Sequence, residues 1–310
     1  MRNSIPRVAN PASQTLAFRV EVSSDKPVWG FSSRTDSSGV RTVFAGTGSD
    51  GIVLESTDLE TWTTFMTVAD CHARSVFVWA EGLFVGTQPL GRIYVHNFAT
   101  GSEYLFVETE DSSVTSFASY NGYLFAGTAP TGIVYSFDGV NWKEEYRPYG
   151  GGVTSMVSSS NGLFVFSSKS EGPVVFDGVS WKTYPSSSGV NQTAASNRVA
   201  SRGFFQSTGL SALEPSEAFA TGINAWSTSD IQMVTPTIPQ FNTEAAALVA
   251  SKIVFGGMDN GVVLSINPSL VEQKITKFAD FGCPISSLVY IEGDTLMAAS
   301  PSTVFLTVAT

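Results

Sequence analysis

The sequence predicts an all-β fold made of repeated four-stranded units, and three observations support this prediction. Charged residues make up 14% of the 310 residues, well below the ~25% of a typical soluble domain. Val, Phe and Thr are abundant while Lys and Glu are scarce, a balance that favours strands over helices. A short apolar stretch ending in glycine recurs along the chain, and no segment of useful length has the 3.6-residue period of an amphipathic helix.

The recurring stretch defines the length of the repeat. Its first copy is VFAGTGSDGIVLES (43–56), and clear copies follow at 83–96, 124–137, 163–176 and 253–266. The glycines that close the first four copies are spaced 40, 41 and 40 residues apart: Gly51, Gly91, Gly132 and Gly172. The next, Gly261, follows after 89 residues, which leaves room for two repeats, and a degenerate copy stands at 203–219. With a last copy at 295–310, the sequence holds seven units.

Each unit has the same internal order of strands and turns. An alternating strand such as SVTSFASY (113–120) leads into a tight turn, Asn-Gly in two units, whose central residues can both take positive φ. The glycine-containing strand, a second turn and a third strand follow. The fourth strand often opens on an aromatic residue: Trp62, Tyr104, Trp142, Trp181 and Trp226. Four short antiparallel strands per ~40–45 residues are typical of a β-propeller. The sequence therefore predicts a seven-bladed β-propeller, with six or eight blades as the alternatives.

The ends of the repeat array predict how the ring closes. The seventh unit has three strands, and one further strand, TLAFRVEVS (15–23), precedes the first unit. We expect that strand to complete the last blade, because an open ring would leave two unpaired sheet edges. The propeller would span 15–310 as a single domain, with an irregular fifth blade and a Pro-rich insertion within 190–241. Segment 231–241 is expected to link the fifth and sixth blades, and residues 1–14 to form an extended N-terminal arm.

Gly46, Gly48 and Gly51 spell G-x-G-x-x-G, the string found in dinucleotide-binding loops. Such a loop opens a helix after its third glycine, whereas here the apolar strand IVLES follows. Later copies replace Gly48 with Gln88 and Ala129, while the other two glycines recur. We therefore interpret Gly46 as a small residue that lets its strand pack close to a neighbouring sheet, and Gly51 as a turn residue that needs positive φ.

Three turns between third and fourth strands share an aspartate and a tryptophan: STDLETW (56–62), SFDGVNW (136–142) and VFDGVSW (175–181). They resemble the Asp box of sialidase-type propellers, although each is one residue shorter. The resemblance implies a role in stabilising the fold, away from any active site. An aspartate here can accept backbone N–H bonds within the turn, while the tryptophan packs between blades. The residues concerned are Asp58, Trp62, Asp138, Trp142, Asp177 and Trp181.

The sequence lacks most recognisable catalytic constellations. A sialidase would need three arginines converging on a carboxylate, and the ten arginines here mostly stand at unrelated positions of the repeat. With His72 and His96 as the two histidines, a serine nucleophile has no evident base. No further ligand follows Cys71-His72 at metal spacing, so no metal and no cofactor are predicted. Cys71 and Cys283 hold equivalent positions in the second and seventh blades, and free thiols, a shared metal or a strained bridge all stay open. A pair of carboxylates of the glycosidase kind also stays open.

In a propeller the loops between second and third strands, and those between successive blades, share one face. We name it the mouth face, because it would surround the mouth of the central channel. Its charged and polar residues are mixed in sign, which suits a protein or a sugar better than a phosphate polymer. The candidate binding residues are Asp50, Asp70, His72, Arg74, Arg92, Asp111, Lys169, Glu171, Asp259 and Asn260.

In overall style the chain resembles propellers of tailed-bacteriophage virions, with low charge, few cysteines, Ser/Thr/Gly-rich strands and degenerate repeats. The resemblance implies a non-enzymatic tail- or capsid-associated component, assembled in the host cytoplasm, that contacts other virion proteins or a host-surface glycan. The alternatives are a glycan-binding propeller, a glycosidase or polysaccharide lyase, and a cellular assembly-factor scaffold. Most tryptophans stand at the outer rim, which counts against the glycan alternatives.

Charge and hydropathy exclude two classes of partner. The net charge of −10 argues against a nucleic-acid partner, which needs clustered Lys and Arg. The sequence contains no run of eighteen apolar residues, so membrane insertion is not predicted. The N-terminal segment has no apolar core of signal-peptide length.

Overall fold

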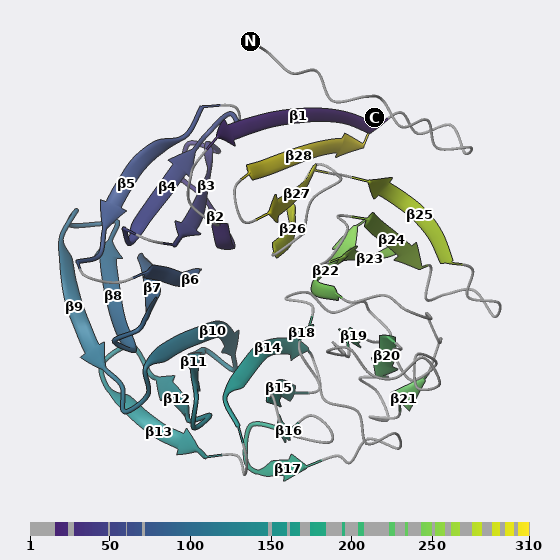
Figure 1. Cartoon of the computed structure of the whole chain (residues 1–310). Helices are drawn as coiled ribbons and strands as arrows, with labels where there is room; N and C mark the ends of the chain where they lie inside the picture. The colour runs from purple at the N-terminus through teal and green to yellow at the C-terminus, as the bar shows by residue number, and fades with distance from the viewer. Residues whose placement is uncertain are drawn as a thin grey trace.

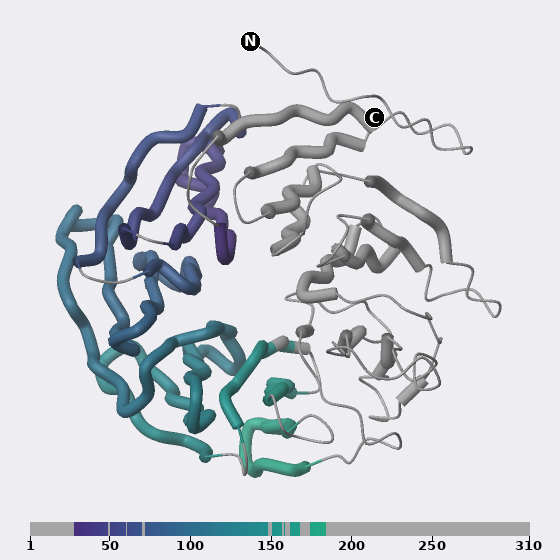
Figure 2. Tube along the Cα trace, in the orientation of Figure 1, coloured from purple at the N-terminus to yellow at the C-terminus, as the bar shows by residue number. Residues whose placement is uncertain are grey.

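The computed structural model describes residues 28–183 with their side chains, except for residues 49, 60, 70, 71, 148–150, 157, 159–161 and 168–173. Outside that range it describes strand segments by their backbone pairing. Figure 2 shows the fully described part of the ring in colour. Among the described residues, no helix has the length and apolar character needed to cross a membrane.

Four antiparallel sheets of four strands follow one another through this range, each with its strands in chain order. The first contains β2 (Val28–Thr35), β3 (Arg41–Thr47), β4 (Ile52–Ser56) and β5 (Thr63–Thr67). The second contains β6 (His72–Trp79), β7 (Gly82–Gln88), β8 (Arg92–Asn97) and β9 (Glu103–Glu108). The third contains β10 (Ser113–Tyr120), β11 (Tyr123–Ala129), β12 (Val134–Phe137) and β13 (Trp142–Tyr146). The fourth contains β14 (Val153–Ser159), β15 (Gly162–Ser167), β16 (Val174–Phe176) and β17 (Trp181–Thr183).

Backbone pairings outside this range define three more four-stranded sheets. One contains β18 (Ala194–Ala195), β19 (Phe204–Ser207), β20 (Ile223–Trp226) and β21 (Met233–Val234). The next contains β22 (Thr243–Val249), β23 (Lys252–Gly257), β24 (Val262–Ile266) and β25 (Ile275–Asp280). The last contains β26 (Ser287–Ile291), β27 (Thr295–Ser300), β28 (Thr303–Ala309) and β1 (Leu16–Ser23).

The sheets are the blades of a β-propeller, as predicted. In each fully described blade the first strand lies nearest the centre of the ring and the fourth lies at the rim (Figure 1). The N-terminal strand β1 runs antiparallel to β28, with Leu16 opposite Ala309, so it completes the last sheet. The propeller class is therefore confirmed, while the predicted count of seven blades rests on backbone pairing for three of the sheets.

The hydrophobic core lies between neighbouring blades. Phe44 of β3 and Val53 of β4 pack with Val76 of β6 and Leu83 of β7 in one cluster. The next cluster joins the second and third blades in the same manner. Alternate residues of each strand thus face one neighbouring sheet or the other, which explains the strong apolar character of the glycine-containing strands.

The recurring glycines have the two roles predicted for them. A Cβ atom on Gly86 would lie 2.7 Å from Val114 Cβ of the next blade, a separation that real side chains do not reach. Gly46 is similarly close to the backbone of Ala73. Gly51 has φ of +62°, and its counterparts in the next two blades are also positive. The G-x-G-x-x-G string is thus confirmed as part of a β-hairpin, in a blade that packs closely against the next one.

Two predictions in the fifth sheet are wrong. Met233 and Val234 form β21, so part of the segment 231–241 is a fourth strand and not wholly a linker. Trp226 ends the third strand, β20, and does not open the fourth. The predicted arm 1–14 and both cysteines lie outside the described residues.

Candidate functional site

The mouth face is built by hydrogen bonds between the two kinds of loop that the sequence places there. The backbone N–H of Val68, in the connection after the first blade, donates to the carbonyl of Gly51 at 2.9 Å. Thr109, one blade later, donates to the carbonyl of Gly91 at 3.0 Å. The blade connections therefore lie against the turns between second and third strands, as predicted.

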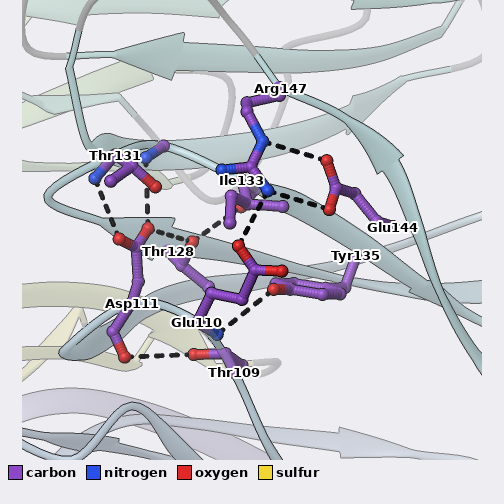
Figure 3. Close-up of polar contacts among 10 residues, drawn as sticks. Thr109, Glu110, Asp111, Thr128, Thr131, Ile133, Tyr135, Glu144 and Arg147 are labelled. Atoms are coloured by element: carbon purple, nitrogen blue, oxygen red, sulfur yellow. Dashed lines mark hydrogen bonds and ion pairs between the residues drawn. The ribbon is translucent and has the colours of Figure 1, made fainter.

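Asp111 accepts hydrogen bonds on both oxygens of its carboxylate. Its carboxylate accepts a 2.6 Å hydrogen bond from the hydroxyl of Thr128, together with backbone N–H bonds from Thr131 at 3.0 Å and Gly132 at 3.2 Å (Figure 3). The side chain is buried, with 5% of the residue exposed. Asp111 thus ties the connection before β10 to the turn between β11 and β12.

These hydrogen bonds set the charge of Asp111. Burial alone would raise the pKa of its carboxyl, but the bonds from Thr128, Thr131 and Gly132 together lower the pKa below its ordinary value. The group is held as a carboxylate with its oxygens already occupied by donors. A general acid needs a raised pKa at neutral pH, so Asp111 is unsuited to that role and acts as a structural anion.

A second polar cluster adjoins Asp111. The guanidinium of Arg147 lies between two carboxylates, with Nη2 2.9 Å from Glu110 Oε2 and 3.0 Å from Glu144 Oε2 (Figure 3). Glu144 and then Glu110 raise the pKa of Arg147. The backbone N–H of Glu110 also donates to the hydroxyl of Tyr135 at 3.3 Å. Sequence reasoning missed this cluster, because Glu110 and Arg147 are 37 residues apart and belong to different connections.

Arg92 and Arg74 have different partners. Arg92 Nε donates to Glu108 Oε1 at 2.7 Å, across the pairing of β8 with β9. Arg74, near the start of β6, lies over the indole ring of Trp29, with Cζ 4.5 Å from the ring centroid. This cation–π pair joins the innermost strands of the first two blades. Trp29 is absent from the sequence-based candidates, although Val28-Trp29-Gly30 occupies the same place in its unit as Ala73-Arg74-Ser75.

The described candidates do not converge on one reacting centre. Asp50 is exposed in the turn after β3, and His72 is half-buried as the first residue of β6. In residues 28–183, as far as they are described, no group of three or more His, Cys, Asp or Glu side chains could hold a metal ion. The other predicted candidates lie outside the described residues: Asp70, Lys169, Glu171, Asp259 and Asn260.

His96, the second histidine, lies at the end of its blade opposite to the mouth face. His96 is near the end of β8, where its Nδ1 lies 3.1 Å from Glu103 Oε1. Its ring packs edge-on against Phe65 of the first blade, with centroids 4.5 Å apart. Arg34 lies over the adjacent Phe98 ring at 4.1 Å. His96 therefore fills an aromatic contact between blades and is no part of the mouth face.

The three aspartates of the Asp-box-like turns stabilise those turns, as predicted. Asp138 Oδ1 accepts the backbone N–H groups of Val140 and Asn141, each at 2.7 Å. Asp177 accepts the corresponding pair and a 2.7 Å bond from Lys182 Nζ. Asp58 bonds Thr61 and Ser56. Donors to the carboxylate lower the pKa of all three groups, led by the Thr61 N–H, the Asn141 N–H and Lys182, respectively.

Two tryptophans of these turns pack between blades. Trp181 stacks on Tyr146 of the preceding blade, with centroids 4.7 Å apart, and on Phe176 of its own blade at 4.9 Å. Trp142 stacks on Phe137 and contacts Phe106 of the preceding blade, with centroids 6.0 Å apart. Trp62 is half-buried directly before β5. The predicted packing between blades is thus shown for Trp142 and Trp181.

Comparisons with known proteins place the fold and leave the activity open. No protein-family model and no curated protein matches the sequence. A streptogramin B lyase structure is similar with a TM-score of 0.79 at 10% identity, over 97% of this chain and 100% of that one. The WD40 β-propeller domain of Doa1 has a TM-score of 0.71 at 14% identity, over 93% and 95%. A structure of YCF48 bound to a D1 peptide has a TM-score of 0.69 at 11% identity, over 99% and 100%. The chain is thus a β-propeller protein of four-stranded blades.

Proposed function

We propose that this protein is a non-enzymatic interaction propeller that binds a protein partner on its mouth face. The observation that carries this proposal is that charged side chains described on the mouth face are held in place by contacts within the fold. Asp111 and Arg92 each form charge-assisted bonds within the fold, and Arg74 is stacked on an indole. The result is a preorganised polar face of mixed sign, and such faces give specificity to protein contacts.

The chemistry of the site supports binding over catalysis. The pKa of Asp111 is lowered, and His96 is engaged with Glu103 away from the mouth face. The fold itself does not decide, since its structural neighbours include a lyase, a WD40 domain and a propeller bound to a peptide. Function must therefore be argued from the site.

The glycan-binding alternative has less support. Sugar sites need open aromatic faces, whereas Trp142 and Trp181 stack on other rings. The guanidinium of Arg74 covers one face of Trp29. We therefore keep glycan binding, and the glycosidase or lyase activities, as outcomes of the test.

The setting we propose is a tail- or capsid-associated component of a phage virion, with a cellular assembly scaffold as the alternative. The support is compositional: 14% charged residues, two cysteines and degenerate Ser/Thr/Gly-rich repeats. The neighbouring genes test this setting. Tail or capsid genes alongside would support it, and their absence would remove it without affecting the proposed mouth-face interaction.

Two matched variants test which face binds. Thr131 is exposed on the mouth face, and its backbone N–H bond to Asp111 survives a change of side chain. The hydrogen bond from its side chain to the same carboxylate is lost, so the unfolding midpoint of each variant is measured to verify that it is folded. Val179, 91% exposed at the tip of an Asp-box-like turn, provides the control on the opposite face. We expect Thr131→Arg to abolish saturable capture of a purified partner and Val179→Arg to leave it unchanged. The reverse pattern would refute the assignment of the face, and saturable glycan binding or turnover would refute the non-enzymatic protein-binding role.

A further inference from the structure

The outer strand of the second blade, β9, has an unpaired edge and exposes two large hydrophobic side chains. Among the described strands, β9 pairs with β8 alone, and it lies at the circumference of the ring (Figure 1). Tyr104 and Leu105, in the middle of this strand, are 44% and 42% exposed. The N–H and C=O groups on the outer side of an edge strand can pair with a further strand. β9 therefore offers an edge to an extended chain segment.

The other described outer strands are protected in the ways that natural sheet edges usually are. The exposed residues of β5 are threonines, and those of β13 are Lys143 and Glu144. The strand β17 has three residues and exposes Lys182 and Thr183. Short length and exposed charges discourage pairing at an edge. β9 is longer than these three strands, with six residues, and its middle is apolar.

A β-bulge places three side chains of β9 on one face of the blade. The register with β8 shifts at Phe106, which is the extra residue on β9. Glu103, Leu105 and Glu108 consequently lie opposite three alternate residues of β8: His96, Tyr94 and Arg92. Alternate residues of a strand share one face of the sheet. Leu105 is therefore flanked on its own face by two carboxylates.

Both carboxylates can accept a further hydrogen bond. Glu103 Oε1 lies 3.1 Å from His96 Nδ1, and Glu108 Oε1 accepts a 2.7 Å bond from Arg92 Nε. Among the described residues, these contacts occupy one oxygen of each carboxylate, and the two glutamate side chains are 42% and 57% exposed. A carboxylate accepts hydrogen bonds on both of its oxygens. The second oxygen of each glutamate is thus available to a cationic side chain.

The charge of this part of the ring favours a cationic occupant. Residues 92–147 contain seven aspartates and glutamates but three lysines and arginines, and the whole chain has a net charge of −10. A second copy of the chain is disfavoured. Antiparallel pairing of β9 with itself would place Glu103 of one copy opposite Glu108 of the other, and like charges directly opposite one another are destabilising.

We propose that β9 is a second docking surface, on which an extended cationic segment of a partner protein adds to the second blade as a fifth strand. Backbone hydrogen bonds along the edge of β9 hold the segment. Its central side chains pack on Tyr104 and Leu105, and a Lys or Arg on either side meets Glu103 and Glu108. This surface lies on the rim, apart from the mouth face, so the proposal goes beyond the function proposed above.

Three synthetic peptides with blocked ends test this surface by titration. The first is Ser-Lys-Thr-Val-Thr-Lys-Ser, which reads the same in both directions and can pair with β9 in either orientation. The second has Glu in place of both lysines. The third is the first with N-methyl groups on its five central amides, which removes their donors and keeps the side chains and charges. We expect saturable binding of the first peptide and at least about tenfold weaker binding of the other two.

Hydrogen exchange of the wild-type protein locates the bound peptide. The amides of β9 that point away from β8 gain carbonyl acceptors when a fifth strand is added, so they should exchange several-fold more slowly in the presence of the first peptide. The amides of β5, the outer strand of the first blade, should exchange at an unchanged rate.

A substitution at Leu105 tests the apolar centre of the surface. We expect Leu105→Lys to weaken binding of the first peptide at least about tenfold, because a charge at an edge opposes pairing and repels the lysines. Val140→Lys is the matched control. It adds the same charge at a residue that is 77% exposed in a turn of the third blade, and it should bind as the wild type does. Unfolding midpoints verify that each variant is folded. If Leu105→Lys does not fold, Tyr104→Lys replaces it, and hydrogen exchange of the wild type remains an independent readout.

Several results would overturn the proposal. These are no saturable binding of the first peptide, equal binding of the second or the third, wild-type affinity in the folded Leu105 variant, or slower exchange confined to strands other than β9. The mouth face is tested separately. Thr131→Arg should leave the affinity of the first peptide unchanged, and loss of peptide binding in that variant would place the peptide on the mouth face and refute docking at β9.

Discussion

The hydroxyl of Thr128 donates a 2.6 Å hydrogen bond to the carboxylate of Asp111, and this contact fixes the turn between β11 and β12 against the connection that enters the blade. The same carboxylate accepts two backbone N–H groups of that turn. The buried carboxylate of Asp111 thus satisfies backbone N–H groups of the turn that have no backbone acceptor.

Removal of this carboxylate should destabilise the protein. We expect Asp111→Ala to lower the free energy of unfolding by about 1–3 kcal/mol, because the Thr131 and Gly132 N–H groups and the Thr128 hydroxyl lose their acceptor. Urea denaturation measures the change. Glu81→Ala is the control, since Glu81 is 70% exposed with a 3.7 Å pair to Arg34, and its effect should stay within about 0.5 kcal/mol. Equal stability of the two variants would show that Asp111 is not structural.

The stability of the protein should fall in acid. The pKa of Asp111 is lower in the folded chain than its ordinary value, and so are the pKa values of Asp58, Asp138 and Asp177. A group with a depressed folded pKa contributes stability above its unfolded pKa and loses that contribution as the pH falls. We therefore expect the thermal midpoint to be steady above about pH 5 and to fall between about pH 5 and 2.

The Asp111→Asn variant shows how much of this acid sensitivity belongs to one group. Its thermal midpoint should be lower than that of the wild type at neutral pH and should change less with pH, because position 111 no longer titrates. A pH profile parallel to that of the wild type would mean that the carboxylates of the turns, and not Asp111, cause the acid sensitivity.

The close packing of blades around Gly86 predicts a third effect. A Cβ at this position would overlap Val114 of the next blade, so Gly86→Ala should cost about 1–3 kcal/mol through overpacking. Gly30 is the matched control, because a Cβ there would meet its nearest atom at 3.9 Å. The two alanine variants are compared by denaturant unfolding. Similar stabilities would contradict the packing role of the recurring glycine.

Much of this architecture follows from the sequence because its determinants repeat. Residues equivalent to Gly86 and Asp138 recur with the period of the blade. The glycine is required by close packing against the next blade, and the aspartate accepts backbone N–H bonds in its turn. The fifth sheet departs from prediction because Met233-Val234 is too short to show an alternating pattern. The pair of Arg74 with Trp29 joins two units, so it becomes visible only when the units are aligned on their bulges. Contacts between distant segments, such as that of Glu110 with Arg147, leave no periodic signal.

Trp181 tests whether the rim tryptophans hold neighbouring blades together. Its ring is half-buried and stacks on Tyr146 of the preceding blade, with centroids 4.7 Å apart. Trp181→Ala should therefore cost about 2–3 kcal/mol, less than the ~3–5 kcal/mol of a fully buried aromatic residue. Trp181→Phe retains a ring in the stack and should cost less than about 1.5 kcal/mol. Hydrogen exchange assigns the effect to the interface: the amides of β13 and β17 should exchange faster in Trp181→Ala than those of β5. Faster exchange throughout the ring, or none at all, would contradict a contact that acts between these two blades.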